Sequence, residues 1–415
     1  MTEKSKPYIR KTFWTIITSN LLHEPLASLY PLLPFILLKN LGATALQIVF
    51  FTMLKPVSSL FSFYWSEKVS QKKHSLYRNL LGASLLSRIP FLLALCFDNV
   101  WLLIMASTIY MIYMRAGIPS WMEILKRNLP SRHLEKYFAI GSAIGYAEGA
   151  LIAISIGSLL DHHIHLWKIL FAISLLLGLI ASLIQASLSS KEEPPEAIES
   201  SKESPWEKFK RPWVDCFSLM KNHSNFRKFQ WAFMIGGMGL MVIQPVIPIF
   251  FAETLKLSYK DLMIAYTICK GLGFVASSPL WSRALGRLPI SLFTSLVLVG
   301  FALFALSILL ATYSYLFIFL AYLFYGVAQA GSHLIWHLSG PLFANENESS
   351  RFSGVNIVMV GIRGVLGPPL GGLLCALFGP ALVLILSVIL CLSGTGSLFL
   401  RHLETEDSLR KKLTS

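Results

Sequence analysis

Charged residues are scarce in this chain of 415 residues: they make up 14% of it, whereas hydrophobic residues make up 54%. Typical soluble domains are about 25% charged and about 45–50% apolar. The polar residues are also gathered into short stretches between long apolar ones. This composition excludes an ordinary soluble dehydrogenase, nuclease or secreted domain, and it is typical of a protein that crosses a membrane many times.

Cysteine is rare as well, and the five cysteines are scattered, four in apolar stretches and one in a polar segment, so no disulfide framework is expected. The glycines at 236–239 are not followed by the Gly-Lys-Ser/Thr of a phosphate loop, which argues against ATP coupling. The first apolar run is too long for a signal peptide and lacks a small-residue cleavage site. No nucleophile, acid or metal triad is clustered in the sequence, so we expect neither an enzyme nor a cofactor or metal.

Apolar stretches long enough to cross a membrane recur along the whole chain. A span needs about 20 mostly apolar residues. The sequence predicts twelve spans, at 12–38, 42–65, 79–97, 100–125, 138–160, 166–188, 229–252, 259–281, 289–311, 314–340, 353–377 and 380–400. The polar linker 189–228 divides them into an N-terminal bundle (1–188) and a C-terminal bundle (229–400), followed by a tail (401–415).

Acidic residues are outnumbered by basic ones, which gives a formal net charge of +14. With the N-terminus inside, the cytoplasmic segments hold 27 of the 36 Lys and Arg residues, and the external loops hold four. This bias predicts a plasma (inner) membrane protein with both termini in the cytoplasm. Most of the basic surplus is then explained by the positively charged cytoplasmic loops, so nucleic acid is not an expected partner.

The two halves of the chain resemble each other at a spacing of about 215 residues. Pro31 and Pro34 match Pro245 and Pro248, and further pairs match in the same order. These pairs are Thr52 with Thr267, Lys55 with Lys270, Trp65 with Trp281, Ala116 with Ala330, Gly149 with Gly364, and Gly157 with Gly372. Repeated six-span halves are one way to build a transporter whose site lies between the halves.

Short basic motifs follow the second span of each half. The first contains Glu67, Lys68 and Lys72, and the second contains Arg283 and Arg287. With the 6 + 6 spans and the long middle loop, they make nearly the whole chain resemble the major facilitator superfamily of secondary transporters. The resemblance implies an all-α membrane protein of twelve helices in two pseudo-symmetric six-helix bundles, and it assigns these loops to gating.

Two further motifs support the same resemblance. Arg115 in span 4 resembles the membrane arginine of the family. The glycine-proline segment 367–372 resembles a motif associated with antiporters, but it lies in span 11, whereas the family carries that motif in span 5.

Ionisable residues within spans are costly and mark functional sites by default. Five bases and two acids occur there: Lys55, Arg88, Arg115, Lys270, Arg363, Glu24 and Glu148. In the family, span 2 packs against span 11 and span 5 against span 8. The resemblance therefore implies that Glu148 faces Lys270 as a gate-like ion pair, and that Arg363 faces Lys55 as two cations suited to an anionic substrate. The alternative is that both lysines bond backbone carbonyls or snorkel.

Glu24 follows His23 and precedes Pro25, where proline frees a backbone carbonyl and makes the site locally polar. A buried carboxyl can carry a proton during transport, and the family implies Arg115 as its neighbour. A static Glu24–Arg115 pair that fixes helix packing is the alternative. Arg88, in a peripheral span, is expected to have a structural role.

His333 and His337 are spaced i, i+4 and therefore share a helix face. We expect them to contact the substrate or a coupling proton, and the alternative is that they only pack against neighbouring helices. Two histidines make a poor metal site. The segment Asp161 to His165 is expected to be a solvated external loop.

The sequence therefore predicts a proton- or ion-coupled transporter of a small organic anion or zwitterion, held by Lys55, Lys270, Arg363 and the span-10 histidines, with Glu24, Arg115 and Glu148 in coupling. Its expected partners are this solute, a coupling proton or ion, and the lipid bilayer, and a monomer is sufficient. Proton-driven efflux of lipophilic or cationic compounds is the first alternative. A transporter-like receptor or a membrane-embedded enzyme is the second.

Overall fold

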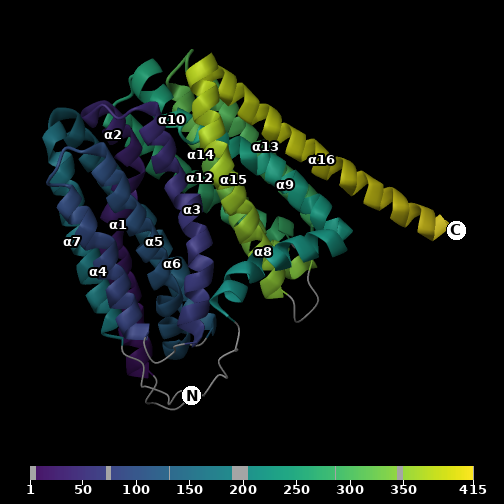
Figure 1. Ribbon diagram of the computed structural model, residues 1–415, viewed down its shortest axis with the longest axis horizontal. Helices are drawn as coiled ribbons and strands as arrows, with labels where there is room; N and C mark the ends of the chain where they lie inside the picture. Colours follow the sequence, from purple (N-terminus) through teal and green to yellow (C-terminus); the bar gives the residue numbers. More distant parts are fainter. Residues whose placement is uncertain are drawn as a thin grey trace. The chain divides into compact units, whose positions relative to one another are not determined.

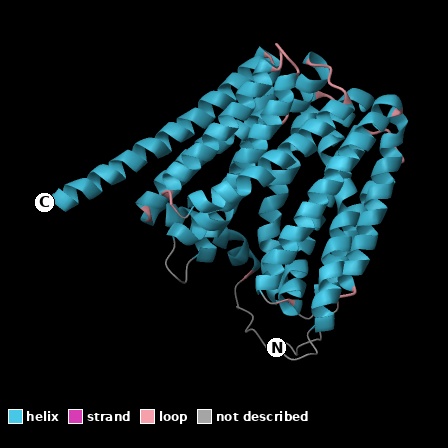
Figure 2. Ribbon diagram, turned by 180° about the vertical axis from the view of Figure 1, so that it is seen from behind, coloured by secondary structure: helices cyan, strands magenta, loops and turns pink. Residues whose placement is uncertain are grey.

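The computed structural model describes residues 6–71, 76–129, 131–188, 204–285, 287–343 and 349–414, and these ranges contain helices and short connections but no strand (Figure 1, Figure 2). Each of the twelve predicted spans falls on helix. Nine stretches within these ranges are long and apolar enough to cross a membrane. The other three predicted spans lie on α3, α4 and α6. The all-helical membrane fold predicted from the sequence is confirmed.

The first six spans correspond to an ordered series of helices. They are α1 (Lys6–Leu29), η2 (Tyr30–Leu32), α2 (Leu33–Leu41), α3 (Ala45–Gln71), α4 (Leu76–Ala94), α5 (Val100–Asn128), α6 (Ser131–His162), η4 (Ile164–Leu166) and α7 (Trp167–Ala186).

The second six spans follow after one additional helix. They are α9 (Ser224–Ile243), α10 (Val246–Ile249), η5 (Phe250–Thr254), α11 (Tyr259–Met263), η6 (Ile264–Cys269), α12 (Lys270–Leu285), α13 (Ile290–Leu310), α14 (Leu316–Phe343), α15 (Ser349–Phe378) and α16 (Pro380–Thr414).

The repeated prolines interrupt the first span of each half. Pro31 is the second residue of the 3-10 turn between α1 and α2, and Pro34 lies in the first turn of α2. Pro245 separates α9 from α10, and Pro248 lies in α10 just before the π-helical turn η5. Proline lacks the backbone N–H and clashes with the preceding turn, so the α-helical hydrogen-bond ladder cannot continue unchanged. The repeat seen in the sequence therefore appears as the same kind of break in both halves.

The linker forms a helix that the sequence analysis did not assign, α8 (Pro205–Asn222). Ser204 and Glu207 form a capping box at its start, with Pro205 in the first turn, where its missing N–H costs nothing. Cys216 and Leu219 of α8 join a buried cluster with Phe226 and Phe352. The linker is thus partly packed against α9 and α15.

The chain divides into two compact units. Unit 1 comprises Met1–Ala43, Ser58–Lys202 and Ser258–Ile268, and unit 2 comprises Thr44–Val57, Glu203–Leu257 and Cys269–Ser415. The start of α3 thus belongs with the second unit, and α11 with most of η6 belongs with the first. The domain boundaries at 188 and 229 remain predictions.

Close helix contacts in unit 2 rest on small residues. α12 packs on α14 with Gly273 against the Leu323 carbonyl and Gly326 against the Lys270 carbonyl. α16 packs on α9, where a Cβ at Gly394 would lie 2.8 Å from the Cα of Gly236. Helices in a bilayer gain little from burying apolar surface, so backbones that approach this closely supply the packing.

Candidate functional site

Glu24 lies in unit 1 against a glycine-rich face of α6. A Cβ at Gly145 would lie 3.0 Å from Oε2 of Glu24, and a Cβ at Gly149 would lie 2.8 Å from Oε1. The hydroxyl of Ser28, one turn along α1, donates to Oε1 of Glu24 at 3.4 Å. The two glycines therefore create the space that this carboxylate occupies between α1 and α6.

Glu148 lies on the same helix as these glycines, directly before Gly149. It is half-buried, and its buried Oε2 has no hydrogen-bond partner within the described ranges. Arg115 on α5 is also half-buried. The predicted Glu24–Arg115 and Glu148–Lys270 pairs remain predictions.

Arg363 is almost completely buried, with 7% of its surface exposed, and its side chain is directed into α9. Its Nη1 donates to the backbone carbonyl of Phe233 at 3.2 Å, and the guanidinium lies 5.0 Å from the centre of that phenyl ring. The guanidinium rests on Gly237, where any Cβ would overlap it. These contacts indicate a packing role for Arg363 in unit 2, and its predicted contact with substrate remains a prediction.

Lys55 has an exposed side chain on α3, and the next residue, Pro56, is buried against Gly364 of α15. The chain neighbours of Lys55 and Arg363 are therefore in contact, as the predicted packing of span 2 on span 11 requires.

The other predicted substrate residues of unit 2 lie on α12 and α14. The Lys270 ammonium lies 5.9 Å from the centre of the Tyr325 ring, and the exposed His333 packs edge-on against Phe274 at 5.4 Å. Arg283 is exposed in the last turn of α12, and Arg287 is exposed in the turn that follows this helix.

Some predicted residues fall outside what the structure describes. Lys72 lies beyond the described residues. The side chains of Glu67, Lys68 and His337 do so as well, although their backbones belong to α3 and α14.

The repeat-related glycines contact the N-terminal parts of spans 8 and 2. In unit 1, a Cβ at Gly149 would lie 3.2 Å from Cγ2 of Thr267, and a Cβ at Gly157 would lie 2.8 Å from the Cα of Lys260. In unit 2, Gly364 contacts Pro56, and Gly372 contacts Val49. The glycine pairs noticed in the sequence thus have the same packing role in both halves.

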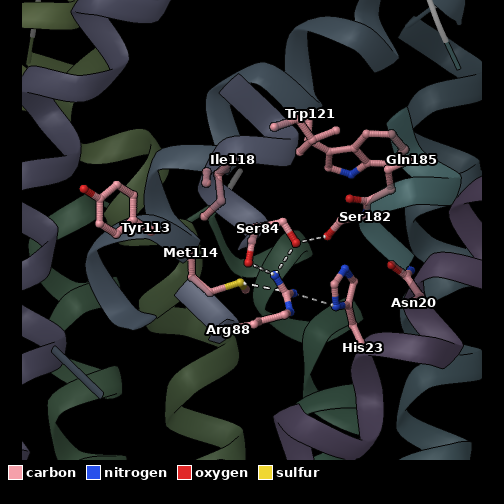
Figure 3. A pocket seen from close by; sticks show the side chains of 13 residues that line it. Asn20, His23, Ser84, Arg88, Tyr113, Met114, Ile118, Trp121, Ser182 and Gln185 are labelled. Atoms are coloured by element: carbon pink, nitrogen blue, oxygen red, sulfur yellow. Dashed lines mark hydrogen bonds between the residues drawn. The ribbon is translucent and has the colours of Figure 1, made fainter. Parts of the chain in front are cut away.

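A cavity of about 210 Å³ lies among α1, α4, α5 and α7 of unit 1 (Figure 3). Its polar lining comes from all four helices. The polar side chains are Asn20 and His23 of α1, Ser84 and Arg88 of α4, Tyr113 of α5, and Ser182 and Gln185 of α7.

Arg88 is the charged residue of this cavity, and only 1% of its surface is exposed. Its Nη1 donates to the Ser84 hydroxyl at 2.7 Å, and its Nη2 lies 3.3 Å from Nδ1 of His23 (Figure 3). Gly178 of α7 leaves room for the guanidinium, because a Cβ there would lie 2.6 Å from Nε. Sequence reasoning gave Arg88 a structural role and missed the cavity. The sequence signal that could have indicated this polar site is Arg88 in the middle of a span, one helical turn after Ser84.

Within the described part of the chain, no group of three or more His, Cys, Asp or Glu residues could hold a metal ion. The ionisable residues of the spans instead lie on several different helices of a helical membrane fold. The sequence model of the Major Facilitator Superfamily matches residues 25–368. The chain belongs to the major facilitator superfamily. No curated protein sequence matches it.

Solved structures of superfamily transporters share the fold across almost the whole chain. A mutant of the nucleoside transporter NupG is 14% identical with a TM-score of 0.71, and the match covers 94% of this chain and 98% of NupG. A mutant of the peptide transporter POT in complex with alafosfalin is 12% identical with a TM-score of 0.70, over 93% and 94% of the two chains.

A bacterial homolog to the human lysosomal transporter Spinster, in an inward-facing and occupied conformation, is 11% identical with a TM-score of 0.63, over 96% and 97% of the chains. At these identities the likeness is one of fold. As a superfamily member the protein is a multi-pass membrane transporter and not an enzyme.

Proposed function

We propose that the protein is a proton- or ion-coupled secondary transporter that moves a small organic anion or zwitterion by alternating access of its two halves. The observation that carries the proposal is the surplus of interior cations over acids. Five bases and two acids lie within the predicted spans. An anionic solute would reduce this surplus of positive charge while it is bound.

Lys55 and Lys270 are the residues proposed to contact the solute. They are repeat-related, and Lys55 has an exposed side chain, whereas Arg363 is buried in its own unit. A lysine in an accessible position can bind a carboxylate as a point charge and release it again.

Coupling is assigned to Glu24 and Glu148. Glu24 lies between α1 and α6, and Glu148 on α6 has a buried oxygen without a described partner. A carboxyl held away from water can exchange a proton as its surroundings change. NupG and POT are named as nucleoside and peptide transporters, and those substrates are not assigned to this chain.

We further propose that the protein works as a monomer in the plasma (inner) membrane with both termini in the cytoplasm. The strong bias of Lys and Arg toward one set of loops supports the orientation of the termini, and one chain is sufficient for alternating access.

Proton-driven efflux of lipophilic or cationic compounds is the second candidate function. Pro368 and Pro369 lie inside α15, in a glycine-proline segment that this function would tolerate. The segment does not support antiport by itself, because the family carries the motif in span 5. An excess of interior bases argues against a cationic substrate.

Thermal unfolding of the purified protein against a panel of anionic, zwitterionic and cationic metabolites tests the proposal. A ligand at 100 times its dissociation constant stabilises the folded state by about 2.7 kcal/mol. The proposal is supported if anions stabilise the protein and this stabilisation is lost in Lys55→Ala and Lys270→Ala. The Lys221→Ala variant, at an exposed position on α8, is the control and should keep it. Stabilisation by lipophilic cations alone would transfer the assignment to efflux.

A further inference from the structure

We infer that the cavity around Arg88 is a binding site for a small anion with a carboxylate or phosphate group, separate from the residues proposed for transport. Lys55, Lys270 and Arg363 do not line it. Its walls are formed by four helices of unit 1, which makes it a pocket inside one bundle.

The first argument is charge. Arginine remains protonated in proteins, and a cation removed from water needs a counter-charge or a full set of hydrogen bonds. The Arg88 guanidinium is almost completely buried, and no carboxylate pairs with it in the described ranges. A bound anion would supply the missing negative charge.

The second argument is the incomplete hydrogen bonding of the guanidinium. Its shortest bond is to the Ser84 hydroxyl, and Nη1 also donates to the Ser84 carbonyl at 3.4 Å and the Ser87 hydroxyl at 3.3 Å. Nη2 lies 3.3 Å from Nδ1 of His23 and 3.5 Å from the Met114 sulfur. All of these groups are neutral or weak acceptors, since a His23 ring that accepts through Nδ1 is uncharged. Nε has no partner among the described residues.

The third argument is the remaining lining of the cavity. The carboxamides of Asn20 and Gln185 both line the cavity, and neither has a hydrogen-bond partner in the part of the chain that the structure describes (Figure 3). The hydroxyls of Ser84 and Ser182 bond each other at 2.7 Å. Amide donors beside a guanidinium are suited to the second oxygen of a carboxylate or phosphate.

The volume sets the size of the ligand. About 210 Å³ corresponds to about seven water molecules at about 30 Å³ each. This space accepts one small organic anion or a single phosphate group. Water can satisfy the amides, but it cannot balance the charge.

The test is a titration of the purified full-length protein in neutral detergent with sodium benzoate and, separately, inorganic phosphate, at ionic strength held constant with sodium chloride. Trp121 lines the cavity, so its fluorescence reports occupancy, and Trp121→Phe identifies its signal. We expect saturable binding that weakens at least about tenfold in Arg88→Gln and persists in Arg287→Gln, an exposed arginine.

A second variant keeps the proposal falsifiable if Arg88→Gln does not fold. Gln185→Leu replaces the carboxamide with an apolar side chain of similar size and keeps the arginine, and we expect a measurable loss of binding. Lys55→Ala should leave the Trp121 titration unchanged, which distinguishes this pocket from the proposed transport site.

The source of the anion is distinguished by a parallel arm. The same fluorescence is recorded in mixed micelles with phosphatidylglycerol or with phosphatidylcholine. A saturable response to benzoate or phosphate identifies a free anion, and a response to phosphatidylglycerol alone identifies a lipid headgroup. Identical curves for wild type and Gln185→Leu with every probe would overturn the proposal.

Discussion

The carboxylate of Asp161, near the end of α6, accepts a hydrogen bond from the backbone N–H of Tyr259, the first residue of α11, at 2.7 Å. Its other oxygen accepts from the N–H of Lys260 at 3.0 Å. The Tyr259 hydroxyl donates to the side chain of Asn40 at 2.9 Å. The start of α11 is therefore fastened to α6 and α2, because free N–H groups at a helix start require acceptors.

Replacing Asp161 with alanine should lower the stability of the protein by about 1–3 kcal/mol, because two backbone N–H groups lose a charged acceptor. Thermal unfolding measures the change. Asp98→Ala is the matched control: its ion pair with Lys168, at 2.7 Å, is largely exposed and should contribute at most about 1 kcal/mol. Equal effects of the two substitutions would contradict the fastening role of Asp161.

Gly364→Ala should destabilise the protein by about 1–3 kcal/mol, because the added Cβ would overlap the Pro56 ring and separate the start of α3 from α15. Gly82→Ala on α4 is the control, since a Cβ there meets nothing within 4 Å and alanine favours helix by up to about 1 kcal/mol. Thermal unfolding and transport assays should both show a loss in Gly364→Ala and none in Gly82→Ala. A Gly364→Ala protein as stable as Gly82→Ala would show that this contact can relax.

The fold was predictable from the sequence because its cause is local. Apolar stretches of about 20 residues must be helical in a bilayer, since every backbone polar group has to be satisfied within the segment. The breaks at the repeated prolines were not predicted, because these prolines were taken only as marks of the internal repeat. Helix α8 was not predicted, because its apolar residues cover only one face. The charged residues around them made the whole linker read as polar.

The surroundings of the charged residues could not be predicted in the same way. That Arg363 faces Lys55 stays a prediction of the family resemblance. No spacing indicated that its guanidinium enters a space that Gly237 opens on another helix, 126 positions earlier in the chain. The cavity around Arg88 depends on Gly178 of α7 and His23 of α1, and no spacing along α4 indicates either. Asp161 was expected in a solvated loop, because the two backbone N–H groups that donate to its carboxylate belong to residues 98 and 99 positions later in the chain.

The structure predicts that Arg363 and Lys55 differ in what they contribute. Arg363→Ala should cost about 2 kcal/mol or more of stability, because it leaves a void where the side chain packs on Phe233. Lys55→Ala should change stability by less than about 0.5 kcal/mol, since its side chain is exposed. Under the proposed function, Lys55→Ala instead loses stabilisation by the anionic ligand. Unfolding curves with and without ligand measure both quantities, and a Lys55→Ala protein that retains full ligand stabilisation would remove Lys55 from the site.

The proposed coupling predicts that proton-driven uptake and solute exchange respond differently when an interior carboxyl is neutralised. Glu148→Gln keeps the shape of the side chain and removes the group that can carry a proton. In proteoliposomes, uptake driven by a pH gradient should be lost, while exchange of labelled for unlabelled solute at equal pH should persist.

Glu24→Gln should show the same split if Glu24 carries the proton, whereas a static packing role would reduce both activities together. Glu253→Gln is the control, because this carboxyl is exposed on η5. Gradient-driven uptake that survives in both the Glu24 and the Glu148 variants would mean that neither carboxyl carries the coupling proton.

Repeating the assay with a sodium gradient at constant pH would then test sodium as the coupling ion. A sodium-coupled transporter should accumulate solute under that gradient alone.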